Sequence, residues 1–193
     1  EEYAKVLYKG VDSLAQAFSQ LDAMPDHNPR HVCDKSEAYL ALISGADYMR
    51  LKALADIQTA QFFLPKEKAS DCITDGTFRD YLAGRAMQGQ AVAKAMALAV
   101  EKRFFLWFLE FPEVMANSGF DCILGNPPFL GGQKISGMFG KNYLEYLKMA
   151  YAPAGSCDIV TYFYRRIFTI IRDKGFQSLL ATNTIAQGGA REG

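Results

Sequence analysis

The stretch from Phe120 to Phe129 combines residue types that could do chemistry on an amino group. Its first five residues are mostly apolar and predict a buried strand, which runs directly into Gly125, Asn126, Pro127, Pro128 and Phe129. The two prolines restrict Asn126 and Pro127 to one stiff, non-helical conformation, and neither proline can donate a hydrogen bond. We therefore expect the Asn126 side-chain oxygen and the Pro127 carbonyl to be two acceptors at a fixed spacing, suited to one amino group.

Phe129 adds a flat aromatic face beside these acceptors. Stacking of a planar base on an aromatic side chain is worth roughly 1–3 kcal/mol in nucleic-acid sites. Residues 126–129 therefore predict a site for an exocyclic amine on an aromatic ring.

The sequence from Phe120 to Phe129 resembles motif IV of amino-group methyltransferases that use S-adenosylmethionine, above all the DNA N6-adenine enzymes. The resemblance implies that an adenine is flipped out of double-stranded DNA, stacked on the aromatic ring and methylated directly on nitrogen. The catalytic residues that it implies are Asn126, Pro127, Pro128 and Phe129.

Three further segments extend this resemblance. Gly155 to Phe163 is similar to the family's motif V, and Ala181 to Gly188 is similar to its motif VI with the loop that follows. The segment from Trp107 to Val114 resembles the large methylases of bifunctional restriction-modification systems and of related phage-defence systems.

The order of predicted elements indicates the fold. A strand over 120–124, helices within 157–174 and a second buried strand over 176–182 predict a right-handed parallel crossover, with the site at the carboxyl ends of the strands. The resemblance implies an α/β fold, a partial Rossmann-like methyltransferase sheet with a large helical insertion. We expect residues 104–193 to be the catalytic part and residues 1–103 to be the insertion.

Residues 1–103 show helical periodicity for most of their length. Apolar spacing predicts an amphipathic helix over Tyr3–Leu21, a loop over Asp22–Lys35 and a helix from Ser36 to about Leu64 that Gly45 could kink. A third helix would be capped by Thr77, and an Ala-rich helical stretch spans 91–100. His27, His31 and Cys33 have helical spacing, but Pro29 argues against a helix there, so no metal site is predicted.

The aromatic run from Phe104 to Phe111 is expected to pack under the sheet rather than to stack on bases.

The glycines between 131 and 140 predict a mobile loop that carries Lys134, and their spacing does not match a phosphate-binding loop of the Walker type. The residues that we expect to contact DNA are Lys134, Lys141, Thr184 and Gln187.

A complete S-adenosylmethionine site in this fold needs a glycine-rich turn, and no two glycines of the chain stand two places apart. We therefore expect that turn to lie upstream of Glu1, in the remainder of the same polypeptide. Asn126 would contact only the edge of the cofactor, and the chain alone is expected to be an inactive fragment of the enzyme.

Charge and cysteine content set broad limits. Lys plus Arg and Asp plus Glu are 21 each, but from Asn126 onward eight basic residues stand against four acidic ones, which suits a DNA contact on one side. The four cysteines lie far apart, with Cys122 and Cys157 in segments expected to be buried, and they suggest no disulfide framework. No apolar run is long enough to span a bilayer, and we expect a soluble, cytoplasmic protein.

Two other classes of function stay open. Enzymes that methylate the glutamine of translation release factors, and some RNA guanine methyltransferases, resemble the same motif. A non-enzymatic helical docking or DNA-binding module is the other alternative. The DNA recognition sequence, a fused nuclease and the oligomeric state do not follow from the sequence.

Overall fold

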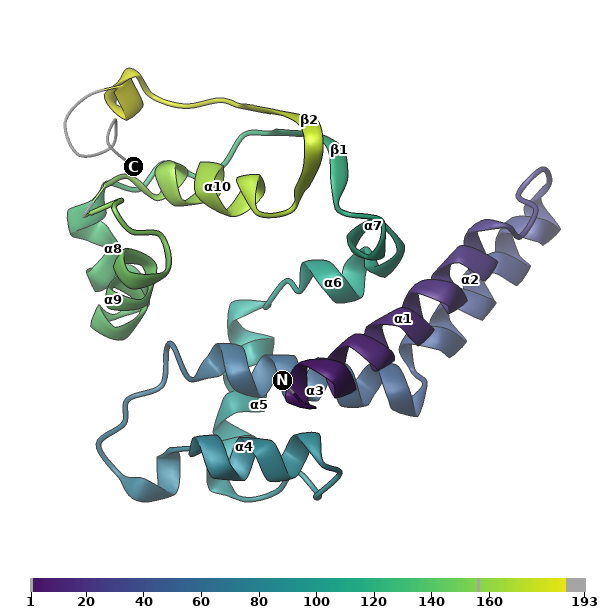
Figure 1. The fold of residues 1–193 in the computed structure, drawn as a ribbon, viewed down its shortest axis with the longest axis horizontal. Helices are drawn as coiled ribbons and strands as arrows, with labels where there is room; N and C mark the ends of the chain where they lie inside the picture. The colour runs from purple at the N-terminus through teal and green to yellow at the C-terminus, as the bar shows by residue number, and fades with distance from the viewer. Residues whose placement is uncertain (1, 156, 187–193) are drawn as a thin grey trace. The chain divides into compact units, whose positions relative to one another are not determined.

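The computed structural model describes residues 2–155 and 157–186, which are rich in helix and contain one small parallel sheet (Figure 1). They form two compact units. The first consists of the residues up to Gln61 together with Lys66–Asn117, and the second of Phe62–Pro65 together with the residues from Ser118 onward. The interpretation of residues 1–103 as an insertion between sheet strands stays a prediction.

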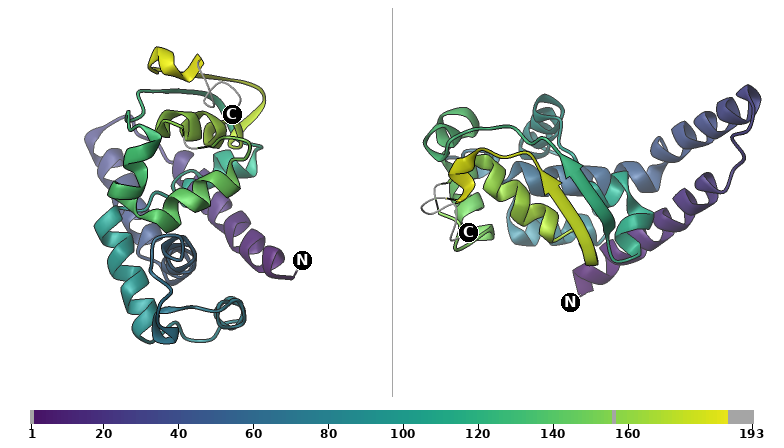
Figure 2. Two further views of the ribbon diagram at one scale, coloured as in Figure 1. Left: turned by 90° about the vertical axis from the view of Figure 1, so that its left-hand side faces the viewer. Right: turned by 90° about the horizontal axis from the view of Figure 1, so that it is seen from above.

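The first unit is built from helices. They are α1 (Glu2–Asp22), α2 (Pro29–Ile43), α3 (Ala46–Ala60), the 3₁₀ helix η1 (Ala69–Asp71), α4 (Asp75–Leu82), α5 (Gln90–Lys102), α6 (Trp107–Glu110) and α7 (Pro112–Ala116). α1 and α2 lie side by side (Figures 1 and 2), and α1 confirms the predicted amphipathic helix. Leu14 of α1 packs in a buried cluster with Tyr48, Leu51 and Leu109.

The segment predicted as a loop over Asp22–Lys35 contains the start of α2, so the prediction is wrong there. Asn28 caps this helix by accepting a hydrogen bond from the His31 amide at 2.9 Å, and Pro29 occupies the first turn. Proline is tolerated in the first turn because the amide it lacks would have no helical partner. The argument from Pro29 against a helix therefore fails.

The single helix expected from Ser36 to about Leu64 is also wrong, because Ser44 and Gly45 separate α2 from α3. α3 ends at Ala60, and residues 62–65 belong to the second unit. The cap of α4 is Thr74 rather than Thr77, since the Thr74 hydroxyl accepts from the Thr77 amide at 3.1 Å.

The aromatic run at Phe104–Phe111 lies in the first unit, and its predicted packing under the sheet of the second unit stays a prediction. Leu109, which is only 1% exposed, packs with Leu14, Tyr48 and Leu51 of the first unit, while Phe105 is 54% exposed. The sequence shows that this run is apolar enough to be buried, but it does not reveal which elements it packs against.

The second unit contains β1 (Phe120–Gly125), α8 (Gly132–Phe139), α9 (Lys141–Ala150), α10 (Ile159–Phe168), β2 (Ile171–Leu179) and the 3₁₀ helix η2 (Asn183–Ala186). β1 and β2 pair in parallel, as predicted, and the regular ladder joins Cys122–Gly125 to Phe176–Leu179. The short helix predicted over Lys141–Tyr151 is confirmed by α9.

The helix expected to continue to Lys174 ends earlier, and Gly175 is not its stop. α10 ends at Phe168, and β2 begins at Ile171 with an irregular segment before Phe176. A Cβ at Gly175 would lie 2.9 Å from the Phe120 carbonyl oxygen, so glycine is needed for the close approach of the two strands.

The strands are less buried than the sequence predicts. Leu124 and Phe176 are each 74% exposed, and Cys122, which is paired with Phe176, is exposed too. α10 packs against β2, and the Tyr164 hydroxyl donates to the Leu179 carbonyl at 2.9 Å. Parallel sheets are usually covered on both faces, whereas the face with Cys122, Leu124 and Phe176 is exposed in the described part of this unit.

The glycine-containing segment after Phe129 forms α8 rather than the predicted mobile loop. Ile135 is fully buried in a cluster with Leu147, Cys157, Ile159 and Tyr162, and this burial outweighs the low helix propensity of Gly132 and Gly137.

All four cysteines are free, with Cys157 buried as predicted. Among the described residues, no helix is both long and apolar enough to cross a membrane.

Candidate functional site

Residues Asn126–Phe129 follow β1 directly and adopt neither helix nor strand. Asn126 and Pro128 are exposed, and Phe129 has 51% of its surface exposed. The amide and the aromatic ring are therefore both accessible at the carboxyl end of a parallel strand, where ligand sites lie in α/β sheets.

Pro127 is buried, unlike its neighbours. The sequence predicts an accessible carbonyl acceptor at Pro127, and the burial of this residue is therefore unexpected. Within the described part of the chain, no group donates a hydrogen bond to its carbonyl oxygen. The use of this oxygen as an acceptor for a substrate amino group stays a prediction.

The strand side of this segment is fixed by β2. Gly125 pairs with Leu179, and its carbonyl accepts a hydrogen bond from the Leu180 amide at 3.0 Å. A Cβ at Gly125 would lie 3.1 Å from Leu179 Cδ2, so a larger residue before Asn126 would require the Leu179 side chain to shift slightly.

The other side is fixed by the start of α10. The Leu130 amide donates to Asp158 Oδ1 at 3.3 Å, and the Leu130 carbonyl accepts from the Ile159 amide at 2.9 Å. Asp158 Oδ1 also caps α10 by accepting from the Val160 amide at 3.1 Å. Residues 126–129 are thus held at both ends, by β2 and by α10.

Asp158 is a site residue that the sequence reasoning missed. The sequence identifies it as the residue before a helix and as part of the motif V resemblance, but not as a partner of Leu130. An aspartate at the start of a helix signals a cap. Its second bond joins residues 28 positions apart, which no local pattern encodes.

The turn before Asp158 is stabilised by a neutral tyrosine. Burial raises the pKa of Tyr162 far above its usual value, and the nearby Cys157 adds to the effect. Its hydroxyl therefore keeps its proton and donates to the Gly155 carbonyl. This bond fixes the chain just ahead of the residues that hold Leu130.

The predicted DNA-contact residues are only partly described. Lys134 lies exposed on α8, and Lys141 is exposed at the first position of α9. Thr184 lies in η2, but its side chain is not described, and Gln187 lies outside the described residues. The structure therefore does not test whether these four side chains lie together, and their role in binding DNA stays a prediction.

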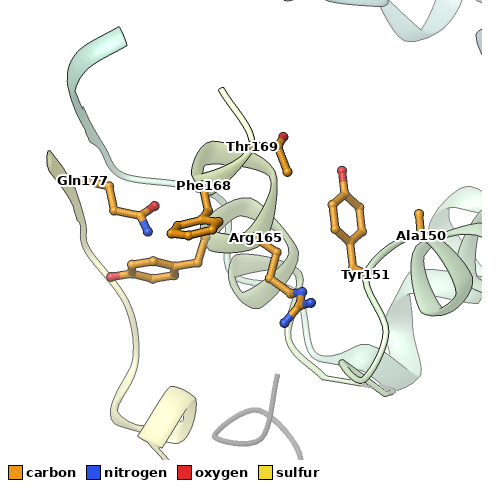
Figure 3. A pocket seen from close by; sticks show the side chains of 7 residues that line it. Ala150, Tyr151, Arg165, Phe168, Thr169 and Gln177 are labelled. Atoms are coloured by element: carbon orange, nitrogen blue, oxygen red, sulfur yellow. The ribbon is translucent and has the colours of Figure 1, made fainter. Parts of the chain in front are cut away.

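A cavity of about 390 Å³ lies elsewhere in the second unit (Figure 3). It is formed by the end of α9, the last turns of α10 and Gln177 of β2, and in Figure 3 Phe168 lies between Gln177 and Arg165. Neither Asn126 nor Phe129 lines it. It therefore belongs to a different part of the unit from the strand end.

The strand-end residues fit an amino group, whether of a substrate or of the cofactor S-adenosylmethionine. The exposed Asn126 offers an amide oxygen, and the Pro127 carbonyl offers a second acceptor. These acceptors suit amino hydrogens of the substrate better than the carboxylate of the cofactor. The strand-end residues therefore suit the amino group of a substrate, and the contact of Asn126 with the edge of the cofactor stays a prediction.

A parallel strand pair with an acceptor-bearing segment at its carboxyl end is consistent with a partial methyltransferase fold. The chain belongs to the Eco57I restriction-modification methylase family, whose family model matches residues 34–192. This match confirms the resemblance to restriction-modification methylases at the level of the family. It also implies S-adenosylmethionine as the usual methyl donor.

One curated protein with a significant match is the release factor glutamine methyltransferase of Dictyoglomus turgidum. It is 29% identical to this chain over 83 residues, which are 43% of this chain and 28% of that protein. The chain thus spans less than a third of the length of this relative. No solved structure gives a significant match.

Proposed function

We propose that the full-length protein methylates the N6 amino group of adenine in double-stranded DNA, as part of a restriction-modification or phage-defence system. The single observation that carries this proposal is the arrangement of an exposed amide and an exposed aromatic ring on a segment fixed at both ends. Membership of the restriction-modification methylase family supports a DNA substrate.

In this proposal the acceptors act on the reacting nitrogen. The N6 lone pair is delocalised into the purine ring, so hydrogen bonds from its two hydrogens to Asn126 Oδ1 and the Pro127 carbonyl would help to localise it. S-adenosylmethionine would supply the methyl group when bound, with its sulfur as the leaving group, and the nitrogen would release a proton to solvent. Preorganised partners of a developing charge are worth about 3–4 kcal/mol each.

Phe129 acts on the ring rather than on the nitrogen. Flipping a base out of the duplex costs a few kcal/mol. Stacking on an aromatic face returns roughly 1–3 kcal/mol, and Phe129 is sufficiently exposed to provide that face. Lys134 and Lys141, with Thr184 and Gln187, would contact the DNA around the flipped base.

The test is the Asn126→Ala variant of the full-length protein, assayed for methyl transfer to plasmid DNA. We expect kcat to fall by at least about 100-fold, because an acceptor of the developing charge is lost. S-adenosylmethionine binding, measured by calorimetry, should persist, since Asn126 only borders the cofactor. Near-normal methylation by this variant would refute the assignment.

A second candidate function is methylation of a protein glutamine, which the similarity to the release factor methyltransferase favours. A glutamine side chain also presents an amino group to paired acceptors, but it has no aromatic ring for Phe129 to stack on. Incubating the full-length protein with methyl donor and either adenine-containing DNA, RNA or a glutamine-containing release factor peptide separates the candidates. Methyl transfer to none of them would favour a docking or DNA-binding module instead.

A further inference from the structure

The second unit includes a short segment from far upstream in the chain. Phe62–Pro65 follow α3 in the sequence, yet they belong to the same compact unit as α8, α9 and the strands. The Phe62 ring stacks on Tyr146 of α9 with ring centres 3.9 Å apart, and Phe63 stacks on Tyr143 at 4.6 Å. The Asn142 side chain also donates to the Leu64 carbonyl at 3.3 Å.

The two tyrosines connect this segment to the core of the unit. Tyr143 and Tyr146 pack against the buried cluster that contains Ile135, Leu147 and Ile159. α8 and α9 lie side by side (Figure 1), and the rings of Phe139 on α8 and Tyr143 on α9 have their centres 5.4 Å apart. The aromatic stack therefore covers one side of the cluster.

Leu130, the residue after Phe129, packs against the same cluster. Its amide and carbonyl are also held by Asp158 and Ile159, at 3.3 Å and 2.9 Å. A continuous series of contacts thus leads from Phe62 and Phe63 through the α9 tyrosines and the cluster to the end of the Asn126–Phe129 segment. Packed interiors transmit small displacements, because they contain little free volume.

We propose that Phe62 and Phe63 are positioning residues for the methyl-transfer site, which they stabilise by holding α9 and the cluster beneath Leu130. The proposal rests on the function proposed above for Asn126–Phe129. It gives the region between α3 and α4 a specific role in the enzyme. Displacement of reacting groups by about 1 Å can cost about 100-fold in rate, so a residue distant from the chemistry can matter for it.

The experiment compares two double variants of the full-length protein, F62A/F63A and F62Y/F63Y. Phe168→Ala is the matched control, because Phe168 is in the same unit, is 76% exposed and is not part of the cluster. The first measurement is hydrogen exchange at the Leu130 amide. We expect it to become about tenfold faster in F62A/F63A and to stay unchanged in the tyrosine variant and in the control.

The second measurement is an ultraviolet titration of the tyrosines. Burial holds the pKa of Tyr143 above its usual value, with smaller contributions from Tyr151 and Tyr146. Loss of the Phe63 ring should expose Tyr143 and lower this pKa toward 10.0, the ordinary value for tyrosine. A lowered pKa with unchanged exchange at Leu130 would show that the stack packs on α9 without positioning the segment, and would overturn the proposal.

The third measurement is steady-state methyl transfer to DNA. We expect kcat to fall about tenfold or more in F62A/F63A, with little change in the KM for the methyl donor and recovery in F62Y/F63Y. Faster exchange at Leu130 with an unchanged kcat would overturn the claim that Phe62 and Phe63 support methyl transfer. A wild-type protein that methylates no DNA would refute the proposed function, while the exchange at Leu130 would still decide whether the stack holds the segment.

If F62A/F63A does not fold, the single variants Phe62→Leu and Phe63→Leu replace it. Leucine keeps most of the apolar volume and removes the flat face that stacks on the tyrosine. The same three measurements then apply, with a smaller expected change. Normal exchange at Leu130 in both single variants would contradict the proposal.

Discussion

The carboxylate of Asp158 holds the amide of Leu130, 28 residues earlier in the chain, through a hydrogen bond of 3.3 Å. The same oxygen caps α10 through the Val160 amide at 3.1 Å. One side chain therefore fixes both the start of a helix and the end of the segment that carries Asn126 and Phe129. The position of the candidate site depends on this shared contact.

The first prediction concerns Asp158. Asp158→Ala removes the helix cap and leaves the Leu130 amide without its partner, so the free energy of unfolding should fall by about 1–3 kcal/mol. Asp158→Asn should lose much less, because asparagine is an equally good cap. Urea denaturation measures both, with Asp173→Ala as an exposed control in the same unit. Equal midpoints for Asp158→Ala and the control would contradict a role for this bond.

The second prediction concerns Phe129. Phe129→Ala should lower kcat/KM for DNA by about 10- to 100-fold, because stacking on the flipped base is lost. The free energy of unfolding should change by no more than about 0.5 kcal/mol, since the side chain is 51% exposed. Phe129→Tyr keeps an aromatic face and should keep most of the activity. If the alanine variant methylates DNA as well as the wild type, Phe129 does not stack on the substrate.

The third prediction tests the helix that replaces the expected loop. Ile135 is 0% exposed and Met138 is 62% exposed, although they lie one helical turn apart on α8. Ile135→Ala should therefore reduce the free energy of unfolding by about 2–5 kcal/mol, whereas Met138→Ala should change it by less than about 0.5 kcal/mol. In a mobile loop neither substitution would matter, so similar small effects would contradict α8. Chemical denaturation distinguishes the two results.

Local patterns predicted the parts of the fold that depend on neighbouring residues. The spacing of apolar side chains identified α1 and α9, and the residue types after Gly125 identified the exposed Asn126 and Phe129 at a strand end. Parallel pairing of β1 with β2 also followed, because the helices between them require a crossover.

The parts that were wrong depend on contacts between distant residues. The glycines at 132 and 137 favour a loop by propensity alone, and only the burial of Ile135 in a tertiary cluster explains α8. Likewise, the approach of Phe120 to Gly175 places Ile171 in a strand rather than in a helix. The bond from Asp158 to Leu130 has no local signature beyond the helix cap.

The last prediction concerns pH and Tyr48 in the first unit. Burial, together with the negative charge of Glu110, raises the pKa of Tyr48 from 10.0 to about 12. The folded state therefore keeps the phenolic proton at pH values where the unfolded chain has released it. The contribution of Tyr48 to stability is fully present below about pH 10 and is lost as the pH rises from there toward about 12.

Phenylalanine at this position has the same ring and no ionisable group, so Tyr48→Phe should lose less stability than the wild type as the pH rises from about 10 to 12. Glu110→Gln removes the nearby negative charge and should lower the pKa of Tyr48, so that the pH range of the loss becomes narrower. Urea midpoints are measured at intervals from about pH 9 to 12. The difference in midpoint between each variant and the wild type is compared at each pH, because the titration of the other tyrosines then cancels. Parallel curves for the wild type and Tyr48→Phe would show that the Tyr48 hydroxyl ionises as readily in the folded protein as in the unfolded chain, contrary to its burial among the helices of the first unit.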